Sequence, residues 1–149
     1  MFVDTYALRG AGDNLEILTL RRSASGRCPG SWETVHGTVE PGETPVQASM
    51  RELHEETGLV PDKFYNLSRT EAFYQHATDE LALIPVFAAF VSAQATVRLS
   101  DEHDRAEWLS AKTAVSRFAW PRERRALDDI LSIVGGGDAD LLEDVLRVS

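Results

Sequence analysis

The sequence is poor in cysteine, has no long apolar run and carries too little positive charge to balance its acids. Its single cysteine, Cys28, has no partner in the chain for a disulfide, so nothing indicates an oxidising compartment. The longest apolar stretch, residues 81–91, is far shorter than the roughly 20 residues that cross a bilayer. The N-terminus lacks the basic and apolar segments of a signal peptide. These absences predict a cytoplasmic protein with no membrane partner.

The charge balance limits the kinds of ligand that the chain can bind. Fifteen Lys and Arg residues stand against 24 Asp and Glu residues, for a net charge of −9. A protein that grips duplex nucleic acid through its phosphates needs a basic face, so this class is excluded. A small phosphorylated substrate remains compatible with the charge if divalent cations bridge the two anions. The 149 residues predict one domain, 1–149, large enough for a substantial core.

Strands and helices are expected to alternate irregularly along the chain. Apolar patterning and turn residues predict strands at 3–9, 15–22, 64–75, 81–93 and 105–109, and an extended segment at 32–35. Helices are predicted at 45–57, 110–118 and 121–134, followed by a short amphipathic tail at 141–148. This order predicts an α/β (α+β) layered domain. The tail packs either on its own domain or on a second subunit, which leaves monomer and homodimer both open.

The helix at 45–57 has clear start and stop signals and an unusual set of acids. Thr44 and Gln47 form a capping-box pattern, and Gly58 suits the left-handed position after the last turn. At about 100° per residue, Glu52, Glu55 and Glu56 occupy an arc of roughly 100°. The buried stripe is predicted on another side, with Val46, Met50, Leu53 and Thr57. Ala48 lies among the acids, where its small side chain is expected to leave open space.

Two interpretations of the acidic arc compete on residue pattern alone. One is a solvated acidic face, which is common on surface helices. The other is a site for a divalent cation, because clustered carboxylates supply the hard oxygen ligands that Mg²⁺ and Mn²⁺ prefer. Cys and His ligands at zinc spacing are absent.

The wider spacing favours the cation site. From Gly37 the chain continues with five residues, Glu43, seven residues and then R-E-L-H-E-E-T-G-L at 51–59. This segment resembles the Nudix box, G-x5-E-x7-R-E-U-x-E-E-x-G-U with U a bulky aliphatic residue, at every defined position. Seven fixed identities at ordinary residue frequencies coincide by chance about once in 10⁸ placements. The chain is therefore identified as resembling Nudix hydrolases.

The resemblance implies a fold, a reaction and a set of site residues. The fold is an α/β/α sandwich in which a mixed sheet lies between helices and the box forms a loop–helix–loop. The reaction is hydrolysis of a nucleoside diphosphate linked to another group, with Mg²⁺ or Mn²⁺ as cofactor. Glu52, Glu55 and Glu56 would bind the metal, together with the main-chain carbonyl of His36. Glu43 would pair with Arg51 and so aim Glu52, which also helps to orient or deprotonate the attacking water.

Further candidates lie outside the box. Glu102 matches the acidic residue that Nudix enzymes supply from another loop as a metal ligand or general base, with Asp79 and Glu80 as rivals. His103 is expected to be a loop or packing residue. Candidate contacts to substrate phosphates are Arg21, Arg22 and Arg27. Candidate stacking partners for a base are Trp32 and either Phe73 or Tyr74, each of which also suits the core.

Flanking residues suggest the substrate. The stretch W-E-T-V-H-G-T-V-E at 32–40 resembles the group of dATP pyrophosphohydrolases and dihydroneopterin triphosphate pyrophosphatases. The later pattern E-H-D-R-A-E-W-L at 102–109 also resembles this group, but diadenosine polyphosphate hydrolases share it. The resemblance implies cleavage of a nucleotide or pterin triphosphate to a monophosphate and pyrophosphate. The alternatives are a diadenosine polyphosphate hydrolase and a Nudix-fold binding module that senses a nucleotide without turnover.

Overall fold

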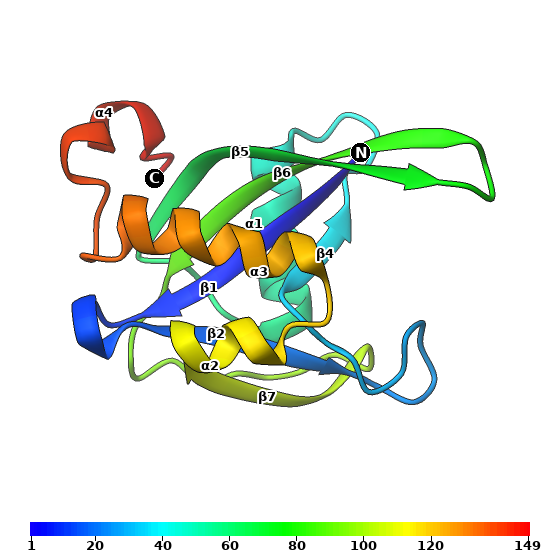
Figure 1. Cartoon of the computed structure of the whole chain (residues 1–149), viewed down its shortest axis with the longest axis horizontal. Helices are drawn as coiled ribbons and strands as arrows, with labels where there is room; N and C mark the ends of the chain where they lie inside the picture. Colours follow the sequence, from blue (N-terminus) through cyan, green and yellow to red (C-terminus); the bar gives the residue numbers. More distant parts are fainter.

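One mixed sheet forms the centre of the molecule (Figure 1). The computed structural model describes every residue from Met1 to Ser149. Its strands are β1 (Phe2–Arg9), β2 (Glu16–Arg22), β3 (Trp32–Glu33), β4 (Val35–Thr38), β5 (Lys63–Gln75), β6 (Glu80–Phe90) and β7 (His103–Ser110). The main path is β3-β2-β1-β6-β5, with β4 beside β1 and β7 beside β2. Only the β1–β6 pair is parallel, so the predicted mixed sheet is confirmed.

Helices cover both faces of this sheet. Helix α1 (Pro45–Thr57) lies on one face, whereas α2 (Ala111–Arg117) and α3 (Pro121–Asp129) cross the other (Figure 1). The chain continues from α3 into a π-helical turn, Ile130–Val134, and later into a 3₁₀ turn, Asp140–Leu142, and the short helix α4 (Glu143–Leu146). A further 3₁₀ turn, Gly12–Asn14, joins β1 to β2. The predicted α/β/α layering is confirmed. No helix has the length and apolar character needed to span a membrane.

Each face of the sheet has its own apolar core. Along β1, Tyr6 and Leu8 pack on the side of α2 and α3, whereas Val3 and Ala7 pack on the side of α1. This alternation follows the two-residue period of a strand. Because both faces are buried, the central strands read as nearly continuous apolar runs.

Helix α1 has the predicted ends but is rotated relative to the predicted stripe. Its capping box is present, and Gly58 has the left-handed conformation with φ of 71°. Ala48 and Leu53 are completely buried in the core on this side, whereas Met50 is only half-buried. The prediction of open space above Ala48 is wrong, because α1 packs its acidic edge toward β4 and β1. Glu56 therefore lies in the middle of the buried arc, with only 3% of its surface exposed.

A fork between β1 and β2 determines where the site forms. These two strands pair only at Leu8–Arg9 and then separate. Strand β4 pairs with the first half of β1, and β3 pairs with the second half of β2. The predicted single extended segment at 32–35 is therefore two strands that diverge at Thr34. The fork brings the segment around Gly37 against α1.

Candidate active site

Gly37 permits the closest contact between the fork and helix α1. A Cβ atom at this position would lie 2.0 Å from the carboxyl carbon of Glu52. No side chain fits in that space, so Glu52 can occupy its observed position only because residue 37 is glycine. The glycine at the start of the box thus places the backbone of β4 directly against a candidate metal ligand.

Arg51 holds three glutamates together. Its Nε and Nη2 each donate to Glu43 at 2.9 Å, so the expected Glu43–Arg51 contact is present and bidentate. Its Nη1 donates to Glu52 at 2.8 Å and to Glu55 at 3.2 Å. These hydrogen bonds lower the pKa of Glu43. Forked guanidinium contacts fix geometry as well as charge, so Arg51 orients the acidic edge of α1.

Glu56 is a buried carboxylate whose burial is not offset by the nearby positive charge of Arg22. Burial raises its pKa well above the ordinary value, and the nearby charges of Glu102, Glu52 and Glu33 raise it further. Its Oε2 atom has no hydrogen-bond partner, and neither has Nδ1 of His103, 3.9 Å away. Unpaired buried polar atoms are rare and costly in folded proteins. Glu56 therefore has an oxygen available for a ligand.

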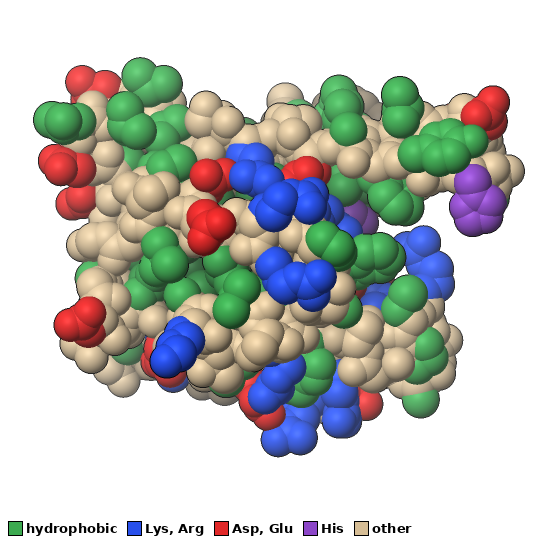
Figure 2. Space-filling view, in the orientation of Figure 1, with side chains coloured by type: hydrophobic (Ala, Val, Ile, Leu, Met, Phe, Trp, Pro, Cys, Tyr) green, Lys and Arg blue, Asp and Glu red, His purple; other side chains and the backbone are tan.

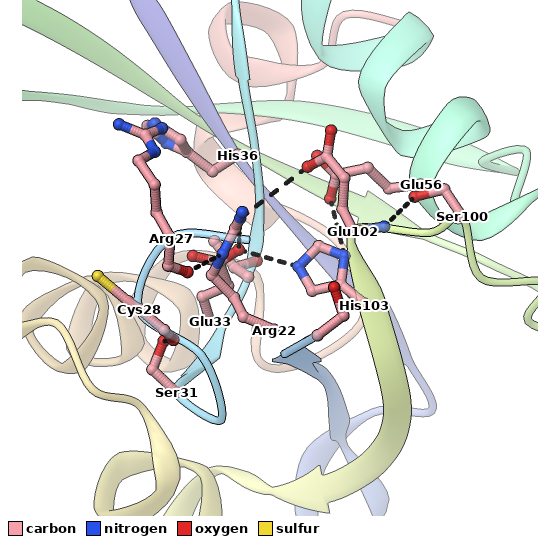
Figure 3. Close-up of polar contacts among 12 residues, drawn as sticks. Arg22, Arg27, Cys28, Ser31, Glu33, His36, Glu56, Ser100, Glu102 and His103 are labelled. Carbon is pink, nitrogen blue, oxygen red and sulfur yellow. Dashed lines mark hydrogen bonds and ion pairs between the residues drawn. The ribbon is translucent and has the colours of Figure 1, made fainter. Parts of the chain in front are cut away.

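A chain of polar contacts holds His103 behind Glu56 (Figure 3). Nε2 of His103 lies 2.9 Å from Oε1 of Glu33, and Nη1 of Arg22 donates to the same oxygen at 2.8 Å. Arg22 also donates through Nε to the main-chain oxygen of Arg27 at 2.6 Å. His103 was expected to be a loop or packing residue. The structure adds that its ring is buried between the carboxylates of Glu33 and Glu56.

The side chains of the acidic edge are of the type that binds a divalent cation, but they are not arranged around a preformed metal site. No three His, Cys, Asp or Glu side chains are close enough together to hold a metal ion as they stand. Glu52 and Glu55 are instead engaged by Arg51. The donors are nevertheless hard carboxylate oxygens, and burial raises the pKa of Glu52 as well as that of Glu56. A cation would offset both the burial cost and the mutual repulsion, and Arg51 binds only one oxygen of Glu52 and one of Glu55.

Two adjoining clefts open beside these acids. The polar cleft, about 640 Å³, is lined chiefly by Arg22, Arg27, His36, Gly37, Glu52 and Glu102. The aromatic cleft, about 140 Å³, adds Cys28, Glu33, Phe73, Gln75, Ile84, Trp120 and Arg122. Phe2, Arg22, Arg27 and His36 belong to both. Figure 2 shows the hollow between the projecting β5–β6 hairpin and the loop after β2. The clefts thus join an acidic end to an aromatic end through basic residues.

Only some of the predicted substrate residues reach the clefts. Arg22 and Arg27 line both clefts, whereas Arg21 forms an ion pair with Asp104 at 2.7 Å and lines neither. Trp32 pairs with Arg21 across the strands, and its ring lies 4.4 Å from the guanidinium of Arg117, also outside the clefts. Successive side chains of a strand point to opposite faces. The predicted substrate contacts of Arg21 and Trp32 are therefore not supported.

Of the candidates that follow the box, only some line a cleft. Glu102 lines the polar cleft together with Glu52. The rival Asp79 accepts a hydrogen bond from Tyr74 at 3.0 Å near the hairpin tip, and neither it nor Glu80 lines a cleft. Of the two stacking candidates, Phe73 lines the aromatic cleft and Tyr74 points away from it.

Several cleft residues escaped sequence analysis. They are Phe2, Glu33, Trp120 and Arg122, together with Asp4, which lies behind the aromatic cleft and binds Arg122. Asp4 is wholly buried and accepts hydrogen bonds from His36 at 2.7 Å and from Arg122 at 2.8 Å. The available signal was a lone charge inside the apolar strand F-V-D-T-Y-A. A buried charge requires a partner, but the sequence did not show which arginine supplies it.

Comparison with known proteins identifies the family. A family model described as the NUDIX domain matches residues 3–130. The chain belongs to the Nudix family. A curated octanoyltransferase of Myxococcus xanthus is 36% identical over 117 residues, which make up 78% of this chain and 32% of that protein. The chain thus spans about a third of the length of this curated relative.

Solved structures share the fold of this Nudix domain. A binary complex of C. elegans Ap4A hydrolase has a TM-score of 0.74 and 22% identity, covering 91% of this chain and 97% of the other. The E. coli dihydroneopterin triphosphate pyrophosphohydrolase has a TM-score of 0.68 and 24% identity, covering 87% and 94%. At these identities the likeness shows the fold alone.

Proposed function

We propose that this Nudix domain hydrolyses a nucleoside or pterin triphosphate to a monophosphate and pyrophosphate, with Mg²⁺ or Mn²⁺ as cofactor. The observation that carries the proposal is the unpartnered oxygen of buried Glu56, which lies on the same acidic edge of α1 as Glu52, a residue that lines the polar cleft. The same cleft holds Arg27, whose guanidinium makes no ion pair within the chain, and leads into aromatic walls. The acids, the arginines and the aromatic rings of the two adjoining clefts match the three parts of such a substrate.

We assign the residues of the acidic edge to two roles, metal binding and positioning. Glu52, Glu55 and Glu56 would hold the cation, with the main-chain carbonyl of His36 as a further ligand. When bound there, a divalent cation polarises phosphoryl oxygens, lowers the pKa of water and neutralises charge on the leaving group. Glu43 and Arg51 position Glu52, a contact whose loss typically costs roughly 10- to 100-fold in such sites.

Glu102 and the arginines complete the proposed machinery. The Glu102 side chain is 58% exposed and lies 3.9 Å from Nη1 of Arg22, so it is free to turn toward a water in the cleft. We assign it the role of general base or additional ligand. Arg22 and Arg27 take the phosphate oxygens, because a guanidinium matches their geometry. Positioning and electrostatics supply most of the catalysis in phosphoryl transfer.

A substrate comparison tests the assignment. The purified protein, supplied with Mg²⁺, is incubated with dATP, dGTP, dihydroneopterin triphosphate and diadenosine tetraphosphate, and the products are identified. We expect pyrophosphate and a monophosphate from at least one triphosphate. Cleavage of the dinucleoside alone would instead show the diadenosine polyphosphate hydrolase, and binding without any product would show the sensing module.

A second experiment tests the acidic edge. The double variant Glu55→Gln/Glu56→Gln removes two candidate ligands while conserving their volume, and we expect activity to fall by more than about 100-fold. The matched control, Glu80→Gln/Asp144→Asn, removes the same number of charges from exposed positions outside the clefts and should retain full activity. Survival of activity in the first variant would refute the proposed metal site.

A further inference from the structure

Arg122 is anchored in the aromatic cleft by a buried carboxylate. Its Nε donates to Oδ2 of Asp4 at 2.8 Å, and its Nη2 lies 3.4 Å from Oδ1. Asp4 is completely buried, and it also accepts the 2.7 Å hydrogen bond from Nδ1 of His36. Because both ends of this pair are fixed by β1 and α3, the guanidinium is held in one orientation before any ligand arrives.

One edge of this guanidinium remains free. Nη1 of Arg122 makes no hydrogen bond within the protein, and it is not sealed from solvent. The side chain is only 13% exposed, and the surface that it does expose lines the aromatic cleft. Arginine carries hydrogen-bond donors and no acceptor. The cleft therefore presents a fixed, donor-only edge in a largely enclosed place.

Aromatic rings line the same cleft. The Trp120 ring lies 5.2 Å from the guanidinium carbon of Arg122. Phe2 stacks on His36 with centroids 5.2 Å apart and planes at 28°, and Phe73 lines the cleft from the β5–β6 hairpin. Such walls favour a flat heterocycle. The triphosphate belongs at the other end, because Glu52 and Glu102 line only the polar cleft.

We propose that Arg122, positioned by Asp4, selects a heterocycle that carries a carbonyl oxygen beside an acceptor ring nitrogen, as in guanine or a pterin, over adenine. This inference rests on the proposed function and names the substrate class within it. Guanine offers two acceptors, O6 and N7, to the N–H groups of the free Nη1, whereas adenine places an amino donor where O6 would be. In the adenine complex an N–H group of Arg122 would face the amino group of the base. Two donors cannot form a hydrogen bond, and leaving buried donors unpaired lowers the affinity.

Selectivity of hydrolysis provides the first test. The ratio of kcat/KM for dGTP to kcat/KM for dATP should be roughly 10 to 100 in the unmodified protein. In Arg122→Gln this ratio should fall toward one, and in Arg122→Lys it should fall in part, because lysine keeps the charge but loses the fork. Arg125→Gln changes an exposed arginine on the same helix that pairs with Glu71, and should preserve the ratio. An equal loss for both substrates would show that Arg122 binds phosphate, and would overturn the proposal.

Binding of nucleosides without metal or phosphate separates this inference from the proposed reaction. Guanosine and adenosine are titrated into the unmodified protein and the two Arg122 variants, with NMR or calorimetry as the measurement and the melting temperature as a check of folding. We expect guanosine to bind more tightly, and the preference to shrink in the variants. That result would support base selection even if no triphosphate is hydrolysed. Equal binding, or a preference for adenosine, by the unmodified protein would overturn it whatever the variants do.

Discussion

At the scale of single residues, the pKa values of four buried carboxylates are shifted in different directions. Burial acts to raise the pKa of Asp4 and Glu33, but their hydrogen bonds to histidine and the nearby arginine charges prevail, so the pKa of each is lowered overall. Glu56 and Glu123 lack sufficient compensation, and burial raises the pKa of both. Glu56 lies at the proposed metal site and Glu123 lies away from both clefts. The same chemical group thus serves as anchor, proposed metal ligand or structural link according to its partners.

Gly37 gives a prediction at this scale. In Gly37→Ala the atoms nearest to the new Cβ belong to the side chain of Glu52, so this flexible side chain is expected to turn away while the fold persists. Misplacement of a catalytic group by about 1 Å typically costs roughly 100-fold, and we expect a loss of kcat/KM of this order. Stability from denaturant unfolding should change by less than about 1 kcal/mol.

A matched glycine makes the result specific. Gly136→Ala adds the same methyl group at a position with no atom within 4 Å and no positive φ, and it should leave activity unchanged. Full activity in Gly37→Ala would mean that the observed position of Glu52 does not matter for the reaction.

At the scale of elements, the ends of helices could be predicted from local sequence signals, whereas contacts between distant parts of the chain could not. The ends of α1 followed from Thr44, Gln47 and Gly58, because caps depend on neighbours in sequence. Its rotation did not follow, since the fork between β1 and β2 decides which side of the helix is covered. The Asp4–Arg122 pair joins residues 118 positions apart, and no local pattern relates them. The position of Arg21 outside the clefts has the same origin, because the direction of a side chain depends on the register of its strand.

Helix α3 is tied to the fork through Glu123, and this link predicts a pH effect. The main-chain N–H of Thr34 donates to Oε2 of Glu123. Burial raises the pKa of Glu123 well above its ordinary 4.5, so above pH 4.5 the unfolded chain loses a proton that the folded chain keeps. Folding stability from this group is therefore full below pH 4.5 and decreases as pH rises, by up to about 1.4 kcal/mol per unit.

Glu123→Gln isolates this contribution. The amide oxygen still accepts from Thr34, but nothing titrates, so stability between pH 5 and 8 should decrease less steeply than in the unmodified protein. Denaturant unfolding across this range measures the slope. Asp128→Asn, an exposed acid on the same helix, should not alter it. Parallel curves for Glu123→Gln and the unmodified protein would contradict the assignment.

At the scale of the whole molecule, the C-terminal tail closes the edge of the sheet. Val148 donates its N–H to the carbonyl of Phe64 at 2.7 Å, and Tyr65 donates its hydroxyl to Glu143 at 3.0 Å. Leu146 is buried in the core beneath α2 and α3. The tail therefore packs on its own chain, which answers one question that the sequence left open. An uncovered strand edge invites association with other chains.

Two leucines of the tail region test its contribution. Leu146 is 5% exposed and Leu141 is 93% exposed. We expect Leu146→Ala to lower the free energy of unfolding by about 2–4 kcal/mol through the cavity that it leaves. Leu141→Ala should change it by less than about 0.5 kcal/mol. Similar values for the two variants, measured by denaturant unfolding, would mean that the tail does not pack as described.

The position of Cys28 makes the molecule convenient for spectroscopy. It is exposed, it lines the aromatic cleft, and it is the only thiol in the chain. A thiol-reactive fluorophore or spin label would therefore attach at one defined place, at the edge of the cleft that we assign to the base. Ligand arrival can then be followed from the label directly, independently of turnover and without any engineered cysteine.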